Sequence, residues 1–248
     1  MINIVPLMLC LLMITTSFAK SIIIAVSANA QYAVDEIINT FKKENPKVDI
    51  KKVVSSSGKL TNQIIKGAPF DIFLSADMKY PNYLYKKGYT INKPKVYAYG
   101  LIVLWTLKPL PLKKEKLNIL QKVKKIAVAN PRTAPYGRES INIIKKLGIL
   151  EQIKTKIIFG ESISQVNYYI IKKLVDVGFT SKSSVLSPKM KNKGIWVEVD
   201  KNLYKPIEQG AVLLKTAKDK KSAYTFFEFL FSSKGKKIFE KYGYLIKQ

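Results

Sequence analysis

The chain has 248 residues, of which 47% are hydrophobic and 24% charged, so it can bury a sizeable core and general disorder is excluded. It carries 43 basic and 17 acidic residues, but only Arg132 and Arg138 are arginine and the lysines are dispersed. Because phosphate and base recognition favours the guanidinium fork, this pattern argues against nucleic-acid binding and indicates a solvated surface. The absence of histidine excludes Ser-His-Asp triads and histidine zinc sites.

The first 19 residues have the pattern of an export signal. An apolar stretch at 4–14 is followed by small polar residues and an A-x-A-like cleavage pattern at 17–19, although no lysine or arginine precedes the stretch. The stretch is shorter than the roughly 20 apolar residues that span a bilayer. We therefore expect cleavage after Ala19 and a periplasmic protein that starts at Lys20. Cys10 is then removed with residues 1–19, which leaves no cysteine for disulfide or thiolate chemistry.

Short β-rich runs alternate with helical segments along the rest of the chain. The runs predicted as strands are 21–26, 48–54, 71–74, 101–105, 125–129, 156–159, 175–179, 195–199 and 211–214. Helical spacing is clearest through Val34, Ile37, Ile38 and Phe41, in a helix that Pro46 should end, and looser through Ile163, Val166 and Ile170. This alternation predicts an α/β fold with mainly parallel sheets. Ligands of such sheets bind beyond the carboxyl ends of the strands.

Four junctions between a predicted strand and the next helix share small, donor-rich residues. They are the segments 27–30, 55–60, 130–138 and 159–165. Each has an ordinary structural explanation: a helix cap at 27–30, a serine turn at 55–60, Tyr136 packing on Pro135, and a capping box between Ser162 and Gln165. Together they offer four helix N-termini with largely neutral loops, which is what a fully ionised small oxyanion needs.

Several longer motifs resemble one known family. They lie at residues 24–30, 55–60, 65–77, 130–138, 160–165, 177–179 and 239–244, and the most specific is the G-A-P-x-D-[I/L]-F-x-S-A-D pattern that ends at Asp77. In order and spacing, these segments are similar to the periplasmic molybdate-binding proteins of ABC importers, and the likeness covers nearly all of the chain after the signal.

The resemblance implies a two-lobed type II periplasmic binding protein, with residues 20–98 and 207–248 in lobe 1, residues 99–206 in lobe 2, and the ligand in the cleft between them. Each lobe is expected to be a mainly parallel sheet flanked by helices. The ligand contacts implied by the resemblance are the side chain and amide of Asn29, the hydroxyl and amide of Ser57, and the amides of Tyr136 and Ile163.

Three further residues are candidates near the same ligand. Ala28 and Ser56 are immediate neighbours of the implied contacts. Many members of the family have a tyrosine shortly after the Gly-Phe strand, where this chain has Ser181, whereas others have it in the Pro-Tyr-Gly loop, as here with Tyr136. We therefore expect the Tyr136 hydroxyl to complete the ligand shell, with Ser181 as the alternative. All these groups would contact the oxygens of the ligand and not its metal.

The function that follows from the resemblance is capture of molybdate or tungstate and delivery to the membrane permease of an ABC importer, by a monomer without a cofactor and without enzymatic activity. A sulfate-type oxyanion is the alternative ligand. Phosphate is disfavoured because it keeps a proton and the implied contacts include no carboxylate, although Glu161 is close in sequence.

Two other classes of function stay open at this point. A secreted hydrolase would need Ser57 as nucleophile and Lys59 as base, and nothing in the sequence desolvates that lysine. A polyanion-binding or membrane-surface protein would explain the net charge of +26, but it requires a clustered basic face. The segment 83–87, with two tyrosines and two lysines, is its nearest candidate.

Overall fold

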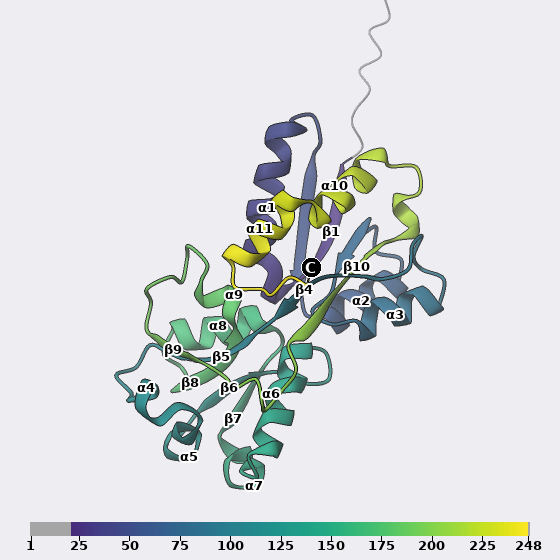
Figure 1. Ribbon diagram of the computed structural model, residues 1–248. Helices are drawn as coiled ribbons and strands as arrows, with labels where there is room; N and C mark the ends of the chain where they lie inside the picture. The colour runs from purple at the N-terminus through teal and green to yellow at the C-terminus, as the bar shows by residue number, and fades with distance from the viewer. Residues whose placement is uncertain (1–20, 248) are drawn as a thin grey trace, which may run out of the picture.

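The computed structural model describes residues 21–247, so the predicted signal at 1–19, with Cys10, lies outside the described residues. Figure 1 shows two lobes, each built on one five-stranded sheet with helices packed on it. The α/β class and the two-lobed architecture predicted above are confirmed. Within residues 21–247, the helices are all too short or too polar to cross a membrane.

The strand order in the first lobe is β2-β1-β3-β10-β4. These strands are β1 (Ile22–Ser27), β2 (Ile50–Ser55), β3 (Ile72–Leu74), β4 (Lys95–Gly100) and β10 (Ile207–Leu213). The helices of this lobe are the one-turn 3-10 helix η1 (Ala28–Ala30), α1 (Gln31–Glu44), α2 (Ser57–Ile65), α3 (Lys79–Lys86), α10 (Lys221–Phe231) and α11 (Ser233–Lys241). Alternate residues of β1 face opposite sides of the sheet, where α1, α10 and α11 cover one face and α2 and α3 the other.

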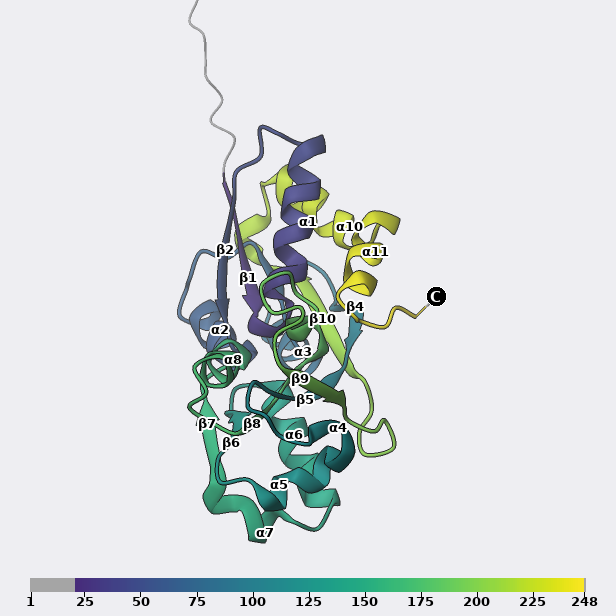
Figure 2. The same cartoon turned by 90° about the vertical axis from the view of Figure 1, so that its left-hand side faces the viewer.

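The strand order in the second lobe is β7-β6-β8-β5-β9. Its strands are β5 (Ile102–Thr106), β6 (Ile126–Ala129), β7 (Ile157–Gly160), β8 (Val177–Ser181) and β9 (Ile195–Glu198). Its helices are α4 (Leu112–Glu115), α5 (Ile119–Lys122), α6 (Pro135–Lys146), α7 (Leu150–Ile153), α8 (Ile163–Ile171) and α9 (Lys182–Val185). The second lobe lies below the first in two views taken at right angles (Figures 1 and 2).

The two helices with the clearest periodicity form as predicted. Helix α1 buries the apolar stripe through Val34 and Phe41, and its last residue is Glu44, two residues before Pro46. The end follows from the restriction that a proline places on the residue before it. Asn45 closes the helix with its side-chain amide, which donates to the Phe41 carbonyl. Helix α8 buries Ile163, Val166 and Ile170 in the same way.

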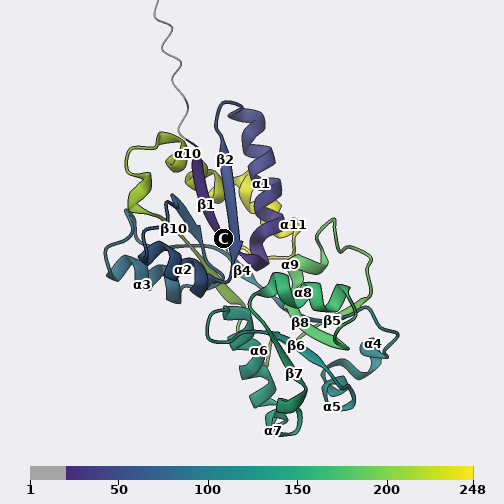
Figure 3. The ribbon, with the colours of Figure 1, turned by 180° about the vertical axis from the view of Figure 1, so that it is seen from behind.

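One strand in each sheet runs against the other four, a feature that the sequence did not predict. In the first sheet β10 is antiparallel to both neighbours, and in the second sheet β5 is. The reversal arises where the chain passes between lobes. β4 ends one sheet and leads through Leu101 directly into β5, whereas β9 ends the other and residues 199–206 lead into β10. Figure 3 shows β10 continuing from the second lobe into the first. The exact division at 98/99 and 206/207 stays a prediction.

The parallel pairings bring the predicted junctions together. β1 and β2 pair in register up to Ser27 opposite Ser55, and β6 and β7 pair up to Ala129 opposite Gly160. The helices that follow these four strands therefore begin side by side within each lobe. Because the lobes face each other across these carboxyl ends, all four helix N-termini lie around one space.

Candidate functional site

A small cavity of about 10 Å3 lies between the two lobes at the four junctions. It is lined by Ser27, Ala28, Asn29, Ser56, Ser57, Ala76, Ala134, Pro135, Tyr136 and Ile163. The lining thus includes all four predicted contacts and two of the three secondary candidates; Ser181 is not among these residues. None of the ten side chains is charged. This volume is far below the roughly 300–1,000 Å3 of pockets for drug-sized ligands, so in the closed arrangement only a small, compact ligand suits the space.

The helices that begin at this cavity have no side-chain cap. The residues before η1, α2, α6 and α8 are Ser27, Ser56, Ala134 and Ser162, and none of their side chains accepts a hydrogen bond from its helix. Two helices elsewhere are capped in the usual way, α9 by Ser181 and α11 by Ser232. The first amide groups of a helix have no partner inside the helix, so those at the cavity are available as donors, reinforced by the partial positive charge of the helix ends.

The predicted capping box between Ser162 and Gln165 at α8 does not form. The side chain of Gln165 accepts a hydrogen bond from the Glu161 amide at 2.6 Å, but Ser162 does not cap the helix in return. The amide of Ile163, the first residue of the helix, has no partner within the helix, and Ile163 lines the cavity.

Two serines at the start of α2 present hydroxyls to the cavity. Ser57 is fully buried, and its Oγ accepts a hydrogen bond of 2.9 Å from the amide of Ala76. The hydroxyl proton of Ser57 can therefore point to a ligand. The Ser56 hydroxyl is buried and has no hydrogen-bond partner among the described residues, and the same is true of the Ser27 hydroxyl. Buried polar atoms without partners are rare, so these hydroxyls indicate a place for an acceptor.

The side chain of Asn29 is engaged within the protein, which argues against its predicted contact with a ligand. Its Nδ2 donates to Gln209 Oε1 at 2.7 Å and to the Tyr244 hydroxyl at 2.9 Å, which uses both amide hydrogens. The carbonyl of Asn29 accepts from the hydroxyls of Ser183 and Tyr244. The buried side chain thus fixes the turn after β1, and the backbone amide is the donor left for the cavity.

Tyr136 lines the cavity, but its hydroxyl lies at the junction between the lobes. A Cβ added to Gly100, the last residue of β4, would lie only 2.0 Å from this hydroxyl, and Gln209 is beside it. Neither Gly100 nor Gln209 lines the cavity. Burial raises the pKa of Tyr136 well above its ordinary value, and Tyr244 adds to the increase, so the hydroxyl stays protonated. Like the Ser27 and Ser56 hydroxyls, it has no hydrogen-bond partner among the described residues, but it lies against Gly100 at the chain crossing.

The loop between β6 and α6 places the amide of Tyr136. The Asn130 carbonyl accepts from the amides of Thr133 and Ala134, and its side chain accepts from the Arg132 amide at 3.0 Å. Pro135 follows at the first position of α6, where an N–H would have no partner within the helix and its absence therefore costs no hydrogen bond. The amide of Tyr136 is consequently the first donor at the end of this helix.

Ser181, the alternative to the Tyr136 hydroxyl, has a structural role instead. Its Oγ accepts from the Ser183 hydroxyl at 3.0 Å and from the Ser184 amide at 3.3 Å, and it lies 2.8 Å from Ser184 Oγ. These contacts cap α9, which explains the serine at the end of β8.

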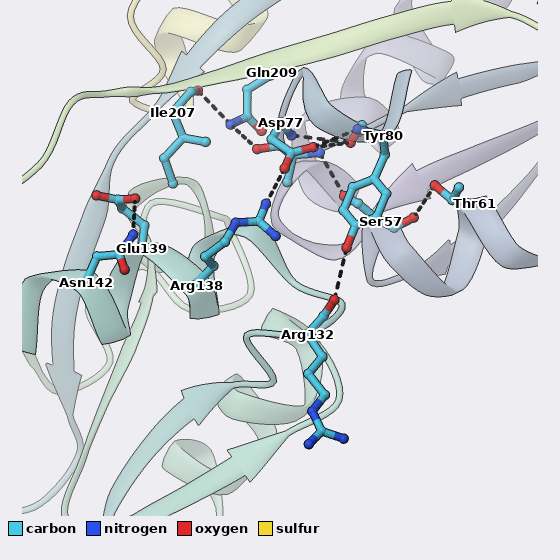
Figure 4. A network of polar contacts seen from close by, with 12 residues as sticks. Ser57, Thr61, Asp77, Tyr80, Arg132, Arg138, Glu139, Asn142, Ile207 and Gln209 are labelled. Carbon is cyan, nitrogen blue, oxygen red and sulfur yellow. Dashed lines mark hydrogen bonds and ion pairs between the residues drawn. The ribbon is translucent and has the colours of Figure 1, made fainter. Parts of the chain in front are cut away.

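The two lobes touch each other around the cavity. The Gly58 amide at the start of α2 donates to the Thr133 carbonyl at 2.9 Å, and the Tyr80 hydroxyl donates to the Arg132 carbonyl at 3.2 Å. Figure 4 shows this second contact together with the ion pair between Asp77 and Arg138. These bonds all join one lobe to the other, so the structure represents a closed arrangement.

Gln209 and Tyr244 support the site and were not predicted as part of it. Gln209 is fully buried in β10, holds Asn29, and donates to the Ala76 carbonyl at 3.1 Å. Tyr244 lies in the C-terminal segment and bonds Asn29 from the other side. A buried glutamine in a strand is a signal that the sequence contains, but its partners are 133 and 180 residues away in the chain.

Comparison with known proteins agrees with this architecture. Residues 22–245 match the family model of bacterial extracellular solute-binding proteins. The molybdate-binding protein ModA of Rhodobacter capsulatus is 34% identical over 228 residues, which cover 92% of this chain and 89% of that protein. ModA of Azotobacter vinelandii is 34% identical over 91% of this chain and 90% of its own length.

A solved structure resembles the whole two-lobed unit. The periplasmic molybdate-binding protein of Azotobacter vinelandii has a TM-score of 0.86 at 28% sequence identity, covering 92% of this chain and 100% of that one. The family model and the relatives both extend over nearly all of the described residues. The chain therefore belongs to the family of bacterial extracellular solute-binding proteins.

Proposed function

We propose that this protein captures molybdate or tungstate outside the cytoplasm and delivers it to the permease of an ABC importer. The observation that carries the proposal is the cavity, where four uncapped helix N-termini and buried serine hydroxyls surround a space without any charged side chain. Neutral N–H and O–H donors suit an anion that carries no proton. The names of the two ModA relatives support the choice of molybdate.

The donors of the site separate classes of anion by their protons. Molybdate, tungstate and sulfate are fully ionised at neutral pH, whereas phosphate keeps a proton that needs an acceptor. No carboxylate lines the cavity, and Glu161, which is close in sequence, pairs with Lys59 at 2.6 Å on the exposed rim. Phosphate therefore loses a hydrogen bond in this site. The cavity's chemistry does not separate sulfate from molybdate, so that choice rests on the relatives.

Capture proceeds by closure of the lobes. With the lobes apart, Ser57 in one lobe and the amides of Tyr136 and Ile163 in the other are separate sets of donors. The anion joins the two sets, and only the closed form completes its shell, so ligand binding favours closure. The net charge of +26 attracts a dianion from a distance, in a manner that salt screens.

The remaining parts of the proposal follow from the family and the sequence. We propose a monomer, export directed by residues 1–19, division into residues 20–98 with 207–248 and residues 99–206, and docking on a membrane permease. The family transports solutes, and binding and release of the anion involve no chemical step.

Calorimetric titration of residues 20–248 tests the ligand directly. Molybdate, tungstate, sulfate and phosphate are compared at one ionic strength. We expect one-to-one binding of molybdate or tungstate, with sulfate and phosphate at least 100-fold weaker, as roughly 3 kcal/mol of difference gives. Sulfate binding as tight as molybdate would overturn the ligand choice, and absence of saturable binding to all four anions would overturn the oxyanion function.

Replacing Ser56 by alanine separates ligand contact from folding. The Ser56 hydroxyl has no partner in the described protein, so Ser56→Ala should leave the free energy of unfolding within about 0.5 kcal/mol of the wild type. A donor to a charged ligand contributes about 1.5 to 3 kcal/mol, so the Kd for molybdate should rise by about 10-fold or more. Urea denaturation and calorimetry measure the two quantities. Unchanged affinity would remove Ser56 from the ligand shell.

Replacing Tyr136 by phenylalanine tests which group of this residue faces the ligand. The amide lies at the start of α6 and the hydroxyl lies against Gly100, so Tyr136→Phe should change the Kd for molybdate by less than about threefold. A loss of tenfold or more would show that the hydroxyl contacts the anion, as the resemblance implied. The melting temperature of the ligand-free variant serves as the folding control.

A further inference from the structure

An ion pair with no role in ligand contact joins the two lobes beside the cavity. Arg138, one of the two arginines in the chain, extends from the first turn of α6 in the second lobe to the Asp77 carboxylate, which follows β3 in the first lobe (Figure 4). The motifs at 65–77 and 130–138 contain these two residues, and the proposed ligand shell uses neither of them.

The pair is connected to the cavity wall on both sides. Ala76, next to Asp77, lines the cavity and donates its amide to the Ser57 hydroxyl at 2.9 Å. Tyr136, two residues before Arg138, lines the cavity from the other lobe. The ion pair therefore forms at the place that determines the distance between these two walls of the cavity.

The carboxylate is held in place before it meets the arginine. Asp77 Oδ1 accepts from the Ser75 hydroxyl and from the Tyr80 amide, both at 3.3 Å, which leaves Oδ2 for the guanidinium. The Tyr80 hydroxyl adds a second link to the same segment of the other lobe, through the Arg132 carbonyl. The first lobe thus presents a fixed acceptor to Arg138.

Burial distinguishes this pair from another ion pair between the lobes. The side chains of Asp77 and Arg138 are 12% and 32% exposed, whereas those of Glu161 and Lys59 are 65% and 42% exposed. Burial raises the pKa of Asp77 and the Arg138 charge opposes this increase, so the carboxylate in the closed form depends on its partner. Removing one member of a buried pair leaves an uncompensated charge, whereas an exposed pair contributes little.

We propose that Asp77 and Arg138 form a clasp that stabilises the closed form and so sets how long the anion stays bound. They are positioning residues, because they act on the distance between the two walls and touch no ligand. The proposal rests on the proposed function, in which closure retains an oxyanion. It assigns the strength of retention to residues outside the ligand shell.

The test compares release rates in a double-mutant cycle. Radiolabelled molybdate bound to residues 20–248 is chased with unlabelled molybdate for the wild type, Arg138→Gln, Asp77→Asn and the double variant. We expect Arg138→Gln to release the anion at least about tenfold faster, because Asp77 is then buried without a partner. The double variant should release molybdate more slowly than Arg138→Gln alone. The association rate constants of all variants should stay within about threefold of the wild type.

The exposed pair provides the matched control. Lys59→Gln, Glu161→Gln and their double variant change the same number of charges at the same interface, and their release rates should stay within about twofold of the wild type. The clasp would be overturned if Arg138→Gln released molybdate at the wild-type rate. It would also be overturned if both cycles showed equal and additive effects on the release rate. Melting temperatures of the ligand-free variants should agree within about 2 °C, since the pair lies between the lobes and belongs to neither hydrophobic core.

A second measurement needs no ligand. Residues 20–248 contain no cysteine, so spin labels at Lys86→Cys in α3 and Lys172→Cys after α8 report the distance between lobes. Arg138→Gln should reduce the closed fraction and the double variant should restore part of it. Identical distance distributions in all variants would overturn the clasp, whereas failure of the wild type to bind any anion would overturn the proposed function and leave this measurement valid.

Discussion

Gly58→Ala is expected to produce a protein that folds more stably and binds its ligand far more weakly. Gly58 lies in the first turn of α2, where an added Cβ would sit 2.9 Å from the Thr133 Cα and 3.0 Å from its carbonyl oxygen in the other lobe. The Tyr80 hydroxyl of the same lobe lies nearer still, at 2.8 Å, but it is the end of a side chain that can move, whereas the Thr133 atoms belong to the backbone and cannot. Overpacking of this kind destabilises by about 1 to 3 kcal/mol, which here falls on the closed form and corresponds to an about 5- to 150-fold higher Kd.

The same substitution has the opposite effect on the open form. With the lobes apart the added methyl meets no second lobe, and alanine is favoured over glycine inside a helix by about 0.5 to 1 kcal/mol. Urea denaturation of the ligand-free protein should therefore show equal or greater stability, while calorimetry with molybdate shows the loss. Asn62→Ala, an exposed position on the same helix, is the control that raises helix propensity without touching the other lobe. Wild-type affinity in Gly58→Ala would contradict the closed arrangement as the binding state.

Asp71→Asn is expected to destabilise the fold strongly while leaving the ligand shell intact. Asp71 is fully buried before β3, and its carboxylate accepts from the Ile23 amide at 2.8 Å. The ammonium of Lys220, next to α10, lies 2.8 Å from one carboxylate oxygen and 2.9 Å from the other. The pair connects the C-terminal helices to β1 and β3, which lie far from those helices in the sequence.

The size of the effect follows from the unpaired lysine that the substitution leaves in the structure. Neutralising Asp71 leaves Lys220, whose side chain is only 21% exposed, without its partner, and breaking a buried pair lowers the free energy of unfolding by about 3 kcal/mol or more. Asp71→Asn with Lys220→Met should recover part of this loss. Glu228→Gln, which breaks the exposed pair with Lys95, should change stability by less than about 0.5 kcal/mol. Equal effects of Asp71→Asn and Glu228→Gln on urea denaturation would contradict this assignment.

The sequence predicts which strand-to-helix junctions surround the cavity because these junctions depend on local signals. The local signals are strand ends, small residues and helix starts, which lie within a few residues of each other in the sequence. Parallel pairing then brings Ser27 beside Ser55 and Ala129 beside Gly160. Ser57 and Ile163 are placed at the cavity as expected. The motif resemblance adds the arrangement of two sheets around one cleft, which periodicity alone does not provide.

The elements missed or misjudged are those that depend on distant contacts. β4 was not predicted, and β10 begins at Ile207 instead of 211, because buried polar residues such as Gln209 and a bulge at Gly210 interrupt the apolar pattern. The Asn29 side chain, whose contact with a ligand stays a prediction, bonds Gln209 and Tyr244, residues 180 and 215 positions away. Such partners follow only from the tertiary fold.

The most direct test of the account is the crystal structure of residues 20–248 with molybdate, using anomalous scattering at the molybdenum edge. The account predicts one strong anomalous peak in the cavity between the lobes, with oxygens within about 3 Å of the Ser57 hydroxyl and of the amides of Tyr136 and Ile163. It also predicts no lysine or arginine side chain among the contacts. Anomalous density on the lysine-rich surface, with none in this cavity, would contradict the assignment of the site and of the anion-binding mechanism.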